Sequence, residues 1–323
     1  RETPATNGWE PLVNPDGDLV FAVLGTQDAP LPEAPANAPN IVFIMADDLG
    51  WTDIQTGTNG PNALAGVNYG SDFYQTPNLA RLAAEGLSFT HCFAHPNCAP
   101  TRAAILSGQY APRSGNGVYV VDQLARPDNS EKPTRFVPPS QREDIPPGHI
   151  ISAEVLQAGG YLTAHFGKYH VGNHEGGAST MPENQGYDFN FGGNSNGGPG
   201  AYHASGQRFG TRIGPGMDAY AKDYSAAYID DVLAPMTNFN DPSVLVDGSK
   251  HVEDSLGDGA IAFMEDHRRG AMSARPFYLQ LHNYAVHSPT DNVQARSDLL
   301  SKYAGLPDGT YHGGNSYAAI VEN

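Results

Sequence analysis

The chain has 323 residues and a formal net charge of −17, because 35 Asp and Glu outnumber 18 Lys and Arg. A nucleic-acid groove or a polybasic membrane anchor needs an excess of cations, so this balance argues against both. The sequence also lacks a run of the ~18 consecutive apolar residues that a membrane span requires. We therefore expect no nucleic acid and no membrane span, and instead a partner that is small or that binds at a local cationic pocket.

Composition favours a large, loop-rich domain over a helical bundle. Only 16% of the residues are charged, and 37 Gly and 26 Pro mark many turns. Residues 1–39 are rich in Pro, Ala, Asn and Asp, and we interpret them as an N-terminal arm or linker. We expect residues 40–323 to form the folded domain. No apolar secretory segment follows Arg1, so we expect any signal peptide to be absent from this chain.

A strand and a helix open the predicted domain. The unbroken apolar run Ile41–Met45 is typical of a strand that is buried on both faces of a mainly parallel sheet. Pro77 at a first helical turn and Gly86 nine residues later bound a helix. The segment Leu87–Phe93 then has the pattern of a second strand.

The rest of the chain continues to alternate helix and strand. The further expected elements are a helix from Ser152 to Gly159, a strand at Tyr161–Phe166, a helix at Asp254–Arg269, a strand at Phe277–His282 and a helical run at Tyr317–Val321. This alternation predicts an α/β fold with a mainly parallel sheet flanked by helices. Two long irregular segments, Arg126–Gly148 and Gly172–Gly216, interrupt it, and loops of that length are usually functional or disordered. Here they are candidates for shaping a substrate pocket.

Two acids, Asp47 and Asp48, directly follow the first predicted strand. Ligands of open α/β sheets collect at the carboxyl ends of the strands, so this pair is well placed to hold a hard divalent cation. Taken alone, the two residues are explained more simply as a helix cap and a solvated loop acid.

The segment from Cys98 to Arg102 precedes an apolar helical stretch. A helix start offers free backbone N–H groups, and Arg102 adds a bidentate donor, so the surroundings favour an oxyanion. The simpler explanation is a buried cysteine beside a surface arginine, or one short disulfide, because Cys92 is the only other cysteine.

Two more clusters follow predicted strands. Lys168 and His170 lie in the loop after the third strand, where an i, i+2 spacing places both side chains on one side of an extended backbone. Lys168 could thus bind an anion next to His170, which could transfer protons near neutral pH. The alternative interpretation is a surface lysine and a packed histidine. His287 comes just after the fourth strand. Together the four clusters supply metal ligands, a nucleophile, two cations and two histidines, which suits hydrolysis of a sulfate or phosphate ester.

The motif Cys98-X-Pro100-X-Arg102 resembles the signature of the type I sulfatases, which belong to the alkaline-phosphatase-like superfamily. The resemblance runs from Asn40 to about Asn323, with Thr101 where Ser is commoner and Tyr169 where Trp is usual. Further matching pieces are Pro39-Asn40-Ile41-Val42, Thr76-Pro77-Asn78-Leu79, Leu106-Ser107-Gly108 and Gly167-Lys168-X-His170-X-Gly172.

The resemblance implies a site and a mechanism. Cys98 would be oxidised to formylglycine, and Asp47 and Asp48 would bind Ca²⁺ together with an oxygen of residue 98. One hydroxyl of the aldehyde hydrate would attack sulfur, and the other would lose a proton, with His170 as base, so that sulfate leaves. Arg102 and Lys168 would hold the hydrate and neutralise charge, while His287 would contact the sulfate or the leaving oxygen.

The family pattern also has a later Asp-Asn metal pair and a later lysine. The pairs Asp128-Asn129 and Asp291-Asn292 follow no apolar strand, and we do not assign them as ligands. We therefore expect residues 40–323 to be the N-terminal portion of a sulfatase catalytic domain that lacks its C-terminal part. These 323 residues alone are then expected to bind Ca²⁺ poorly.

The resemblance implies a sulfuric ester hydrolase that acts on a sulfated small molecule or glycan, and we expect a sulfated carbohydrate or polysaccharide. The protein would be periplasmic or secreted, and a formylglycine-generating or equivalent maturation enzyme would be its partner. Two alternatives stay open from the residues. One is a phosphomonoesterase or phosphodiesterase of the same superfamily, and the other is a non-catalytic fragment that binds sulfated glycans.

Overall fold

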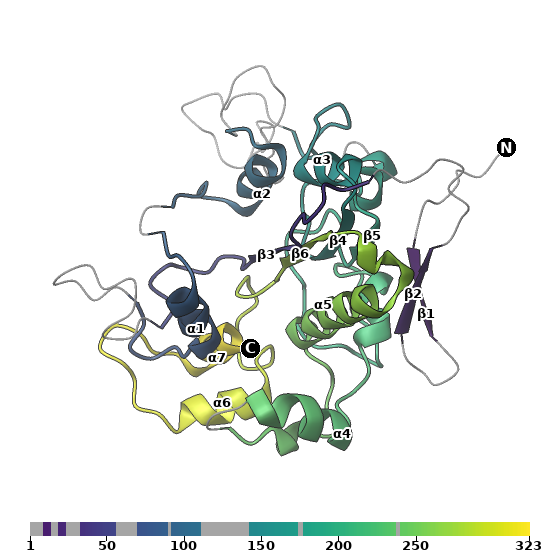
Figure 1. The fold of residues 1–323 in the computed structure, drawn as a ribbon. Coiled ribbons are helices and arrows are strands. Elements are labelled where there is room, and N and C mark those ends of the chain that lie inside the picture. Colours follow the sequence, from purple (N-terminus) through teal and green to yellow (C-terminus); the bar gives the residue numbers. More distant parts are fainter. Residues whose placement is uncertain are drawn as a thin grey trace.

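A four-stranded parallel sheet organises the computed structural model (Figure 1). Its strands lie in the order β3 (Ile41–Met45), β6 (Phe277–His282), β4 (Leu162–Gly167) and β5 (Phe189–Phe191). The structure describes residues 9–13, 19–23, 33–55, 70–89, 92–110, 142–173, 177–236 and 240–323. Because all three pairings are parallel, the carboxyl ends of β3, β6 and β4 lie at the same edge of the sheet.

Helices cover both faces of the sheet, with α5 on one side and α2 and α3 on the other (Figure 1). The helices are α1 (Pro77–Glu85), α2 (Cys98–Ser107), α3 (Ser152–Ala158), the single turn α4 (Ala226–Tyr228), α5 (Val252–Arg269), α6 (Ser297–Ala304) and α7 (Asn315–Glu322). Short 3₁₀ turns occupy residues 177–180, 182–184, 215–220, 234–236, 242–245 and 271–274, and a π turn occupies 229–233.

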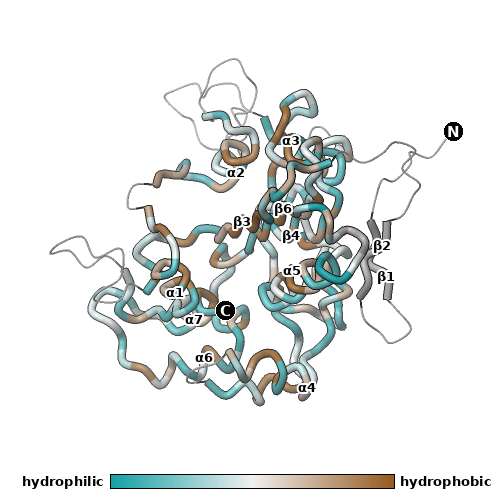
Figure 2. Tube along the Cα trace, in the orientation of Figure 1, coloured by the Kyte–Doolittle hydropathy of each residue, from teal (hydrophilic) through white to brown (hydrophobic). Residues whose placement is uncertain are grey.

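The alternation of side chains along β4 explains the two cores. Leu162, Ala164 and Phe166 point to the face that packs on α5, where Leu256 and Phe263 complete the larger core. Thr163 and His165 point to the opposite face, which is more polar. Figure 2 shows apolar residues gathered at the central strands. The sheet is therefore the boundary between an apolar layer and a layer that holds buried polar groups next to α2 and α3.

Most of the predicted elements are confirmed. The strands Ile41–Met45 and Phe277–His282 have the expected bounds, and the helix after Thr76 ends at Glu85, just before Gly86. The α/β fold with a parallel sheet and flanking helices follows. In the segment Gly172–Gly216, the described residues contain β5 and several 3₁₀ turns, which the sequence pattern did not indicate.

Two strand predictions are wrong in different ways. The first strand, β3, lies at an edge of the described sheet, and its residues Val42 and Ile44 are 46% and 58% exposed rather than buried. For Leu87–Phe93, residues 87–89, 92 and 93 are irregular, and 90 and 91 lie outside the described residues. Leu87 and Phe93 are largely exposed, since no described strand runs beside them to provide pairing or cover.

Strands β1 (Trp9–Val13) and β2 (Leu19–Val23) pair antiparallel within the segment that we interpret as an arm. The sequence pattern did not indicate this pair. Residues 126–141 of the first long irregular segment, with Asp128-Asn129, lie outside the described residues. None of the described helices is long and apolar enough to cross a membrane.

Candidate active site

The backbone of the site is an extension of the parallel sheet beyond the ends of its strands. After β3, the Asp47 amide donates to the Ala285 carbonyl at 2.8 Å, and the Val286 amide donates to the Asp47 carbonyl at 2.5 Å. After β4, the Lys168 amide donates to the His282 carbonyl at 2.9 Å. These bonds hold the three strand-end loops side by side, so their side chains converge as the sequence predicts.

Asp47 is the buried anion of the site, and two predicted residues surround it. The Lys168 ammonium forms an ion pair with Asp47 Oδ2, and Arg102 Nη2 lies 3.5 Å from Asp47 Oδ1. All three side chains are at least 96% buried. Burial lowers the pKa of Arg102, and the charge of Asp47 opposes that effect. Since an arginine is ionised at all ordinary pH values, the buried centre holds two cations against one carboxylate.

Cys98 and His170 face each other beside this centre. Cys98 is the first residue of α2, and its Sγ lies 3.4 Å from His170 Nδ1. His170 is buried and adopts a left-handed φ of 66°, which is uncommon for a residue other than glycine. Both cysteines are free, so the structure does not contain the disulfide that Cys92 and Cys98 would allow. The thiol is therefore next to a base and at a helix start.

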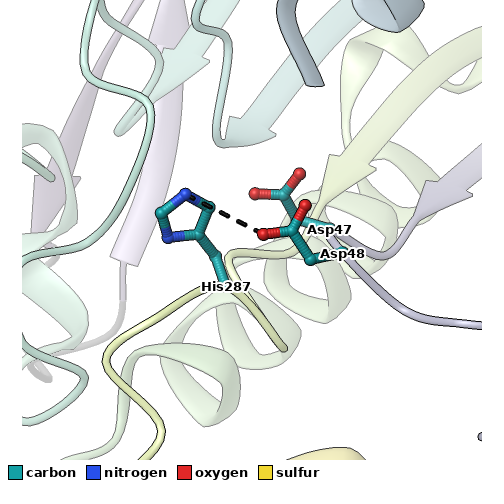
Figure 3. A group of neighbouring side chains, drawn as sticks. All are labelled: Asp47, Asp48 and His287. Carbon is teal, nitrogen blue, oxygen red and sulfur yellow. Dashed lines mark ion pairs between the residues drawn. The ribbon is translucent and has the colours of Figure 1, made fainter. Parts of the chain in front are cut away.

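Asp48 and His287 lie at the exposed side of the site (Figure 3). His287 Nε2 is 4.0 Å from Asp48 Oδ2, and Asp48 has a left-handed φ of 58°. One ligand atom from each of Asp47, Asp48 and His287 lies within 4.8 Å of the other two. The two carboxylates fit a calcium ion, which prefers oxygen ligands, but calcium takes six to eight of them. Residue 98, water or other groups would have to complete such a site.

A buried carboxyl that sequence reasoning missed supports the loop before His287. Glu253 Oε1 accepts hydrogen bonds from the amides of Tyr284 and Ala285, at 3.0 and 2.9 Å. Burial raises the pKa of Glu253 to about 8. The residue lies one position before the predicted helix Asp254–Arg269, and an acid in a first turn is so common that it gave no functional signal.

A buried histidine pair lies behind Arg102, and sequence reasoning missed it as well. Arg102 Nη1 donates to the Lys168 carbonyl at 2.5 Å and lies 3.1 Å from His282 Nδ1. His282 Nδ1 also lies 3.2 Å from the Lys168 carbonyl, so Arg102 and His282 meet at this carbonyl. Burial lowers the pKa of His165 to about 3 and that of His282 well below its usual value, so both rings are neutral. The position of His282 at a strand end was the available signal.

Comparison with protein families gives one clear match. A family model described as Sulfatase matches residues 39–308. A protein named Sulfatase from Formosa agariphila is 35% identical over 302 residues, which covers 88% of this chain and 50% of that protein. Human arylsulfatase A is 38% identical over 157 residues, covering 48% of this chain and 25% of that protein. The chain thus spans half or less of the length of these relatives.

Solved structures share the fold. The crystal structure of a protein named Ps i-CgsB has a TM-score of 0.52 and 23% identity, and covers 88% of this chain and 52% of that one. The same protein in complex with k-i-k-neocarrahexaose gives a TM-score of 0.52 and 22% identity, with the same coverage. At these identities the likeness shows a shared fold alone, and it agrees with the predicted α/β fold with a mainly parallel sheet flanked by helices.

Removing the carboxylate of Asp47 should destabilise the fold strongly. In Asp47→Asn, Lys168 and Arg102 stay buried without a counter-charge, which costs about 3–5 kcal/mol. The control is Asp48→Asn, because the Asp48 side chain is 55% exposed and its loss should change stability by less than ~0.5 kcal/mol. Urea unfolding of both variants with a calcium chelator present measures the difference. Equal stabilities would show that Asp47 does not balance the two cations.

The raised pKa of Glu253 should make stability depend on pH. Its protonated form is the one that the fold favours, so this contribution is complete below pH 4.5 and is lost as the pH rises through about 8. Glu253→Gln keeps the acceptor oxygen and cannot ionise. Relative to this variant, the wild type should lose on the order of 3 kcal/mol between pH 5 and pH 8 in urea titrations. Glu265→Gln, at an exposed site of the same helix, should show no such trend. If the stability difference between the wild type and Glu253→Gln does not change with pH, the raised pKa of Glu253 is contradicted.

Proposed function

Because this chain belongs to the sulfatase family, we propose that its site hydrolyses a sulfate ester and that the intact protein is a sulfuric ester hydrolase. The observation that carries the proposal is the meeting of a thiol, a base and two buried cations at one point. Cys98 Sγ lies 3.4 Å from His170 Nδ1, while Arg102 and Lys168 lie together at Asp47. The proposed residues are Cys98, Arg102, Lys168, His170 and His287, with Asp47 and Asp48 as metal ligands.

In this proposal, a maturation enzyme oxidises the Cys98 side chain to formylglycine. The hydrate of that aldehyde would supply two hydroxyls on one carbon. Attack of one on sulfur would break the bond between sulfur and the substrate oxygen, which leaves as the alcohol. Loss of the proton from the other would re-form the aldehyde as the carbon–oxygen bond to sulfate breaks. Position 98 suits this role because it begins α2, where free amides and the helix dipole favour negative charge. A plain thiol or hydroxyl has no second hydroxyl, and its sulfated form would be stable.

His170 is the proposed base. Its Nδ1 already faces the side chain of residue 98, at 3.4 Å in the unmodified protein. An imidazole nitrogen can take a proton from residue 98 in one step and return it later. Its buried position and its left-handed backbone hold the ring at this place.

Lys168 and Arg102 are proposed to stabilise the negative charge that builds up on the sulfate oxygens. Both side chains are buried and already oriented by Asp47 and by the Lys168 carbonyl. Groups that need no reorganisation during the reaction are the most effective at this task. His287, which is only 26% exposed, is proposed to contact the sulfate or the leaving oxygen through Nε2.

Asp47 and Asp48 are proposed to hold Ca²⁺ together with an oxygen of residue 98. When bound, the ion supplies positive charge next to the ester and favours the oxyanion form of its neighbours. The donor set supports this assignment, since two carboxylates from consecutive residues converge with His287 within 4.8 Å.

We propose a sulfated carbohydrate as the substrate class. One protein of the same fold was solved with a neocarrahexaose, and a canine relative that is 35% identical over 170 residues is named N-acetylgalactosamine-6-sulfatase. That relative covers 52% of this chain and 27% of its own length. We also propose that the protein is periplasmic or secreted. Its proposed partner is a formylglycine-generating or equivalent maturation enzyme.

The decisive experiment combines mass spectrometry with paired assays. The peptide that contains Cys98, from protein coexpressed with a formylglycine-generating enzyme, should carry an aldehyde in place of the thiol. The modified protein should hydrolyse a sulfate ester at least about 100-fold faster than the phosphate ester of the same alcohol, and Cys98→Ala should abolish turnover. A preference for phosphate would favour the phosphatase alternative. An unmodified thiol in a protein that binds sulfated glycans without turnover would favour a binding role.

The roles of Asp48 and His287 can be separated by calcium dependence. Asp48→Asn should raise the Ca²⁺ concentration for half-maximal turnover by about 10-fold or more, because it removes a charged oxygen ligand. His287→Asn should lower kcat/KM about 100-fold and leave that Ca²⁺ concentration unchanged. Turnover of a sulfate ester at varied free Ca²⁺ measures both effects. If His287→Asn weakens calcium binding as much as Asp48→Asn does, then His287 is a metal ligand.

A further inference from the structure

Two consecutive glycines lie against the two histidines of the site. A Cβ at Gly197 would lie 2.5 Å from both Cε1 and Nε2 of His170. A Cβ at Gly198 would lie 2.7 Å from Cε1 and 2.8 Å from Nδ1 of His287. Distances below 3.0 Å essentially never occur for a real Cβ, so either side chain would force its histidine to move. Each glycine therefore lies so close to one imidazole ring that no side chain fits between them.

In each histidine, the ring nitrogen nearer to its glycine is not the nitrogen that faces the site. His170 presents Nδ1 to Cys98, and Gly197 covers Cε1 and Nε2. His287 presents Nε2 to Asp48, and Gly198 covers Cε1 and Nδ1. His287 Nδ1 also lies 2.7 Å from the Ser288 carbonyl, which can only accept, so Nδ1 carries the proton. Each ring thus has one nitrogen toward the site and the other nitrogen close to a glycine.

The need for glycine here is spatial and not conformational. Neither Gly197 nor Gly198 has a left-handed φ, whereas Gly192 and Gly200 in the same loop have φ values of 81° and 75°. An alanine at position 197 or 198 is therefore compatible with the backbone, and the three atoms nearest to its methyl group would all belong to the imidazole ring. The lack of a side chain is what allows the loop to approach both rings.

The loop is fixed on both sides of the two glycines and cannot retreat easily. The Asn194 carbonyl accepts from the His170 amide at 2.9 Å, and the Asn194 side chain donates to the Arg212 carbonyl at 2.9 Å. After the glycines, the Tyr202 hydroxyl donates to the His287 carbonyl at 2.6 Å. Since the same loop binds the segments that carry both histidines, a displaced ring has to move relative to the rest of the site.

We propose that the Gly197–Gly198 backbone positions both histidines, by holding His170 with Nδ1 toward residue 98 and His287 with Nε2 toward the cation and the sulfate ester. This inference rests on the proposed function, which assigns a chemical role to each of these two ring orientations. Gly197 and Gly198 are positioning residues, because they act only through the rings that they contact. The long loop Gly172–Gly216, an expected part of the substrate pocket, would thus also control the general base.

The test uses Gly197→Ala and Gly198→Ala, with Gly210→Ala as the matched control. Gly210 lies in the same segment, lacks a left-handed φ, and has no atom within 4 Å of an added Cβ. Gly197→Ala and Gly198→Ala should each lower kcat/KM for a sulfate ester about 10- to 100-fold, since a misplacement of ~1 Å has that effect. Gly210→Ala should change it less than about twofold.

A double-mutant cycle separates positioning from a general structural loss. If Gly198 acts through His287, then Gly198→Ala should cost about 10-fold or more in the wild type and less than about twofold in His287→Ala. The same loss in both backgrounds would overturn the proposal. Gly198→Ala is the clearer variant, because His287 is partly exposed and its ring has room to turn without unfolding the chain.

An NMR measurement keeps the inference testable apart from the activity. The imidazole nitrogens of His287 and His170, observed in long-range ¹H–¹⁵N spectra, should shift in Gly198→Ala and Gly197→Ala respectively, and neither should shift in Gly210→Ala. If these signals move while no sulfate ester is hydrolysed by any variant, the proposed function fails and the positioning stands. If all imidazole signals stay unchanged, the positioning itself is refuted.

Discussion

The ion pairs of Asp47 with Lys168 and Arg102 are the interaction on which the site depends. They join the end of β3, the end of β4 and the first turns of α2, three elements far apart in sequence. Two buried cations without an anion would be very costly, and the carboxylate would be equally costly alone. The charge arrangement and the packing of α2 on the sheet therefore form together. The proposed anionic ester would therefore meet a positive centre, although the chain as a whole carries a charge of −17.

The neutral imidazoles behind Arg102 keep that positive charge concentrated at the guanidinium and the lysine. Burial lowers the pKa of His165 to about 3, and His282 is affected in the same direction, so neither adds a third buried charge. His282 Nδ1 instead lies close to both Arg102 Nη1 and the Lys168 carbonyl, to which Arg102 also donates. The polar face of the sheet thus acts as a support for α2, while the apolar face packs on α5.

Periodicity and strand-end position predicted the parts of this protein that depend on local sequence. The bounds of β3 and β6 and the convergence of Asp47, Lys168 and His287 follow from apolar runs and from the geometry of parallel sheets. The exposure of Val42 on β3 and the irregular backbone at Leu87 do not follow from local sequence. Whether a segment pairs as a strand and is covered from solvent depends on other elements. Glu253, His282 and the glycines at 197 and 198 were missed for the same reason, since each matters through a partner more than 20 residues away.

The hydrogen bonds that continue the sheet past its strands have a consequence for motion. The amides of Asp47, Lys168 and Val286 are bonded to neighbouring loops in the way that strand residues are bonded to neighbouring strands. Such amides exchange with solvent only when the surrounding cooperative unit opens. The catalytic edge should therefore exchange as slowly as β4 and β6, and local opening of surface helices would leave its geometry intact.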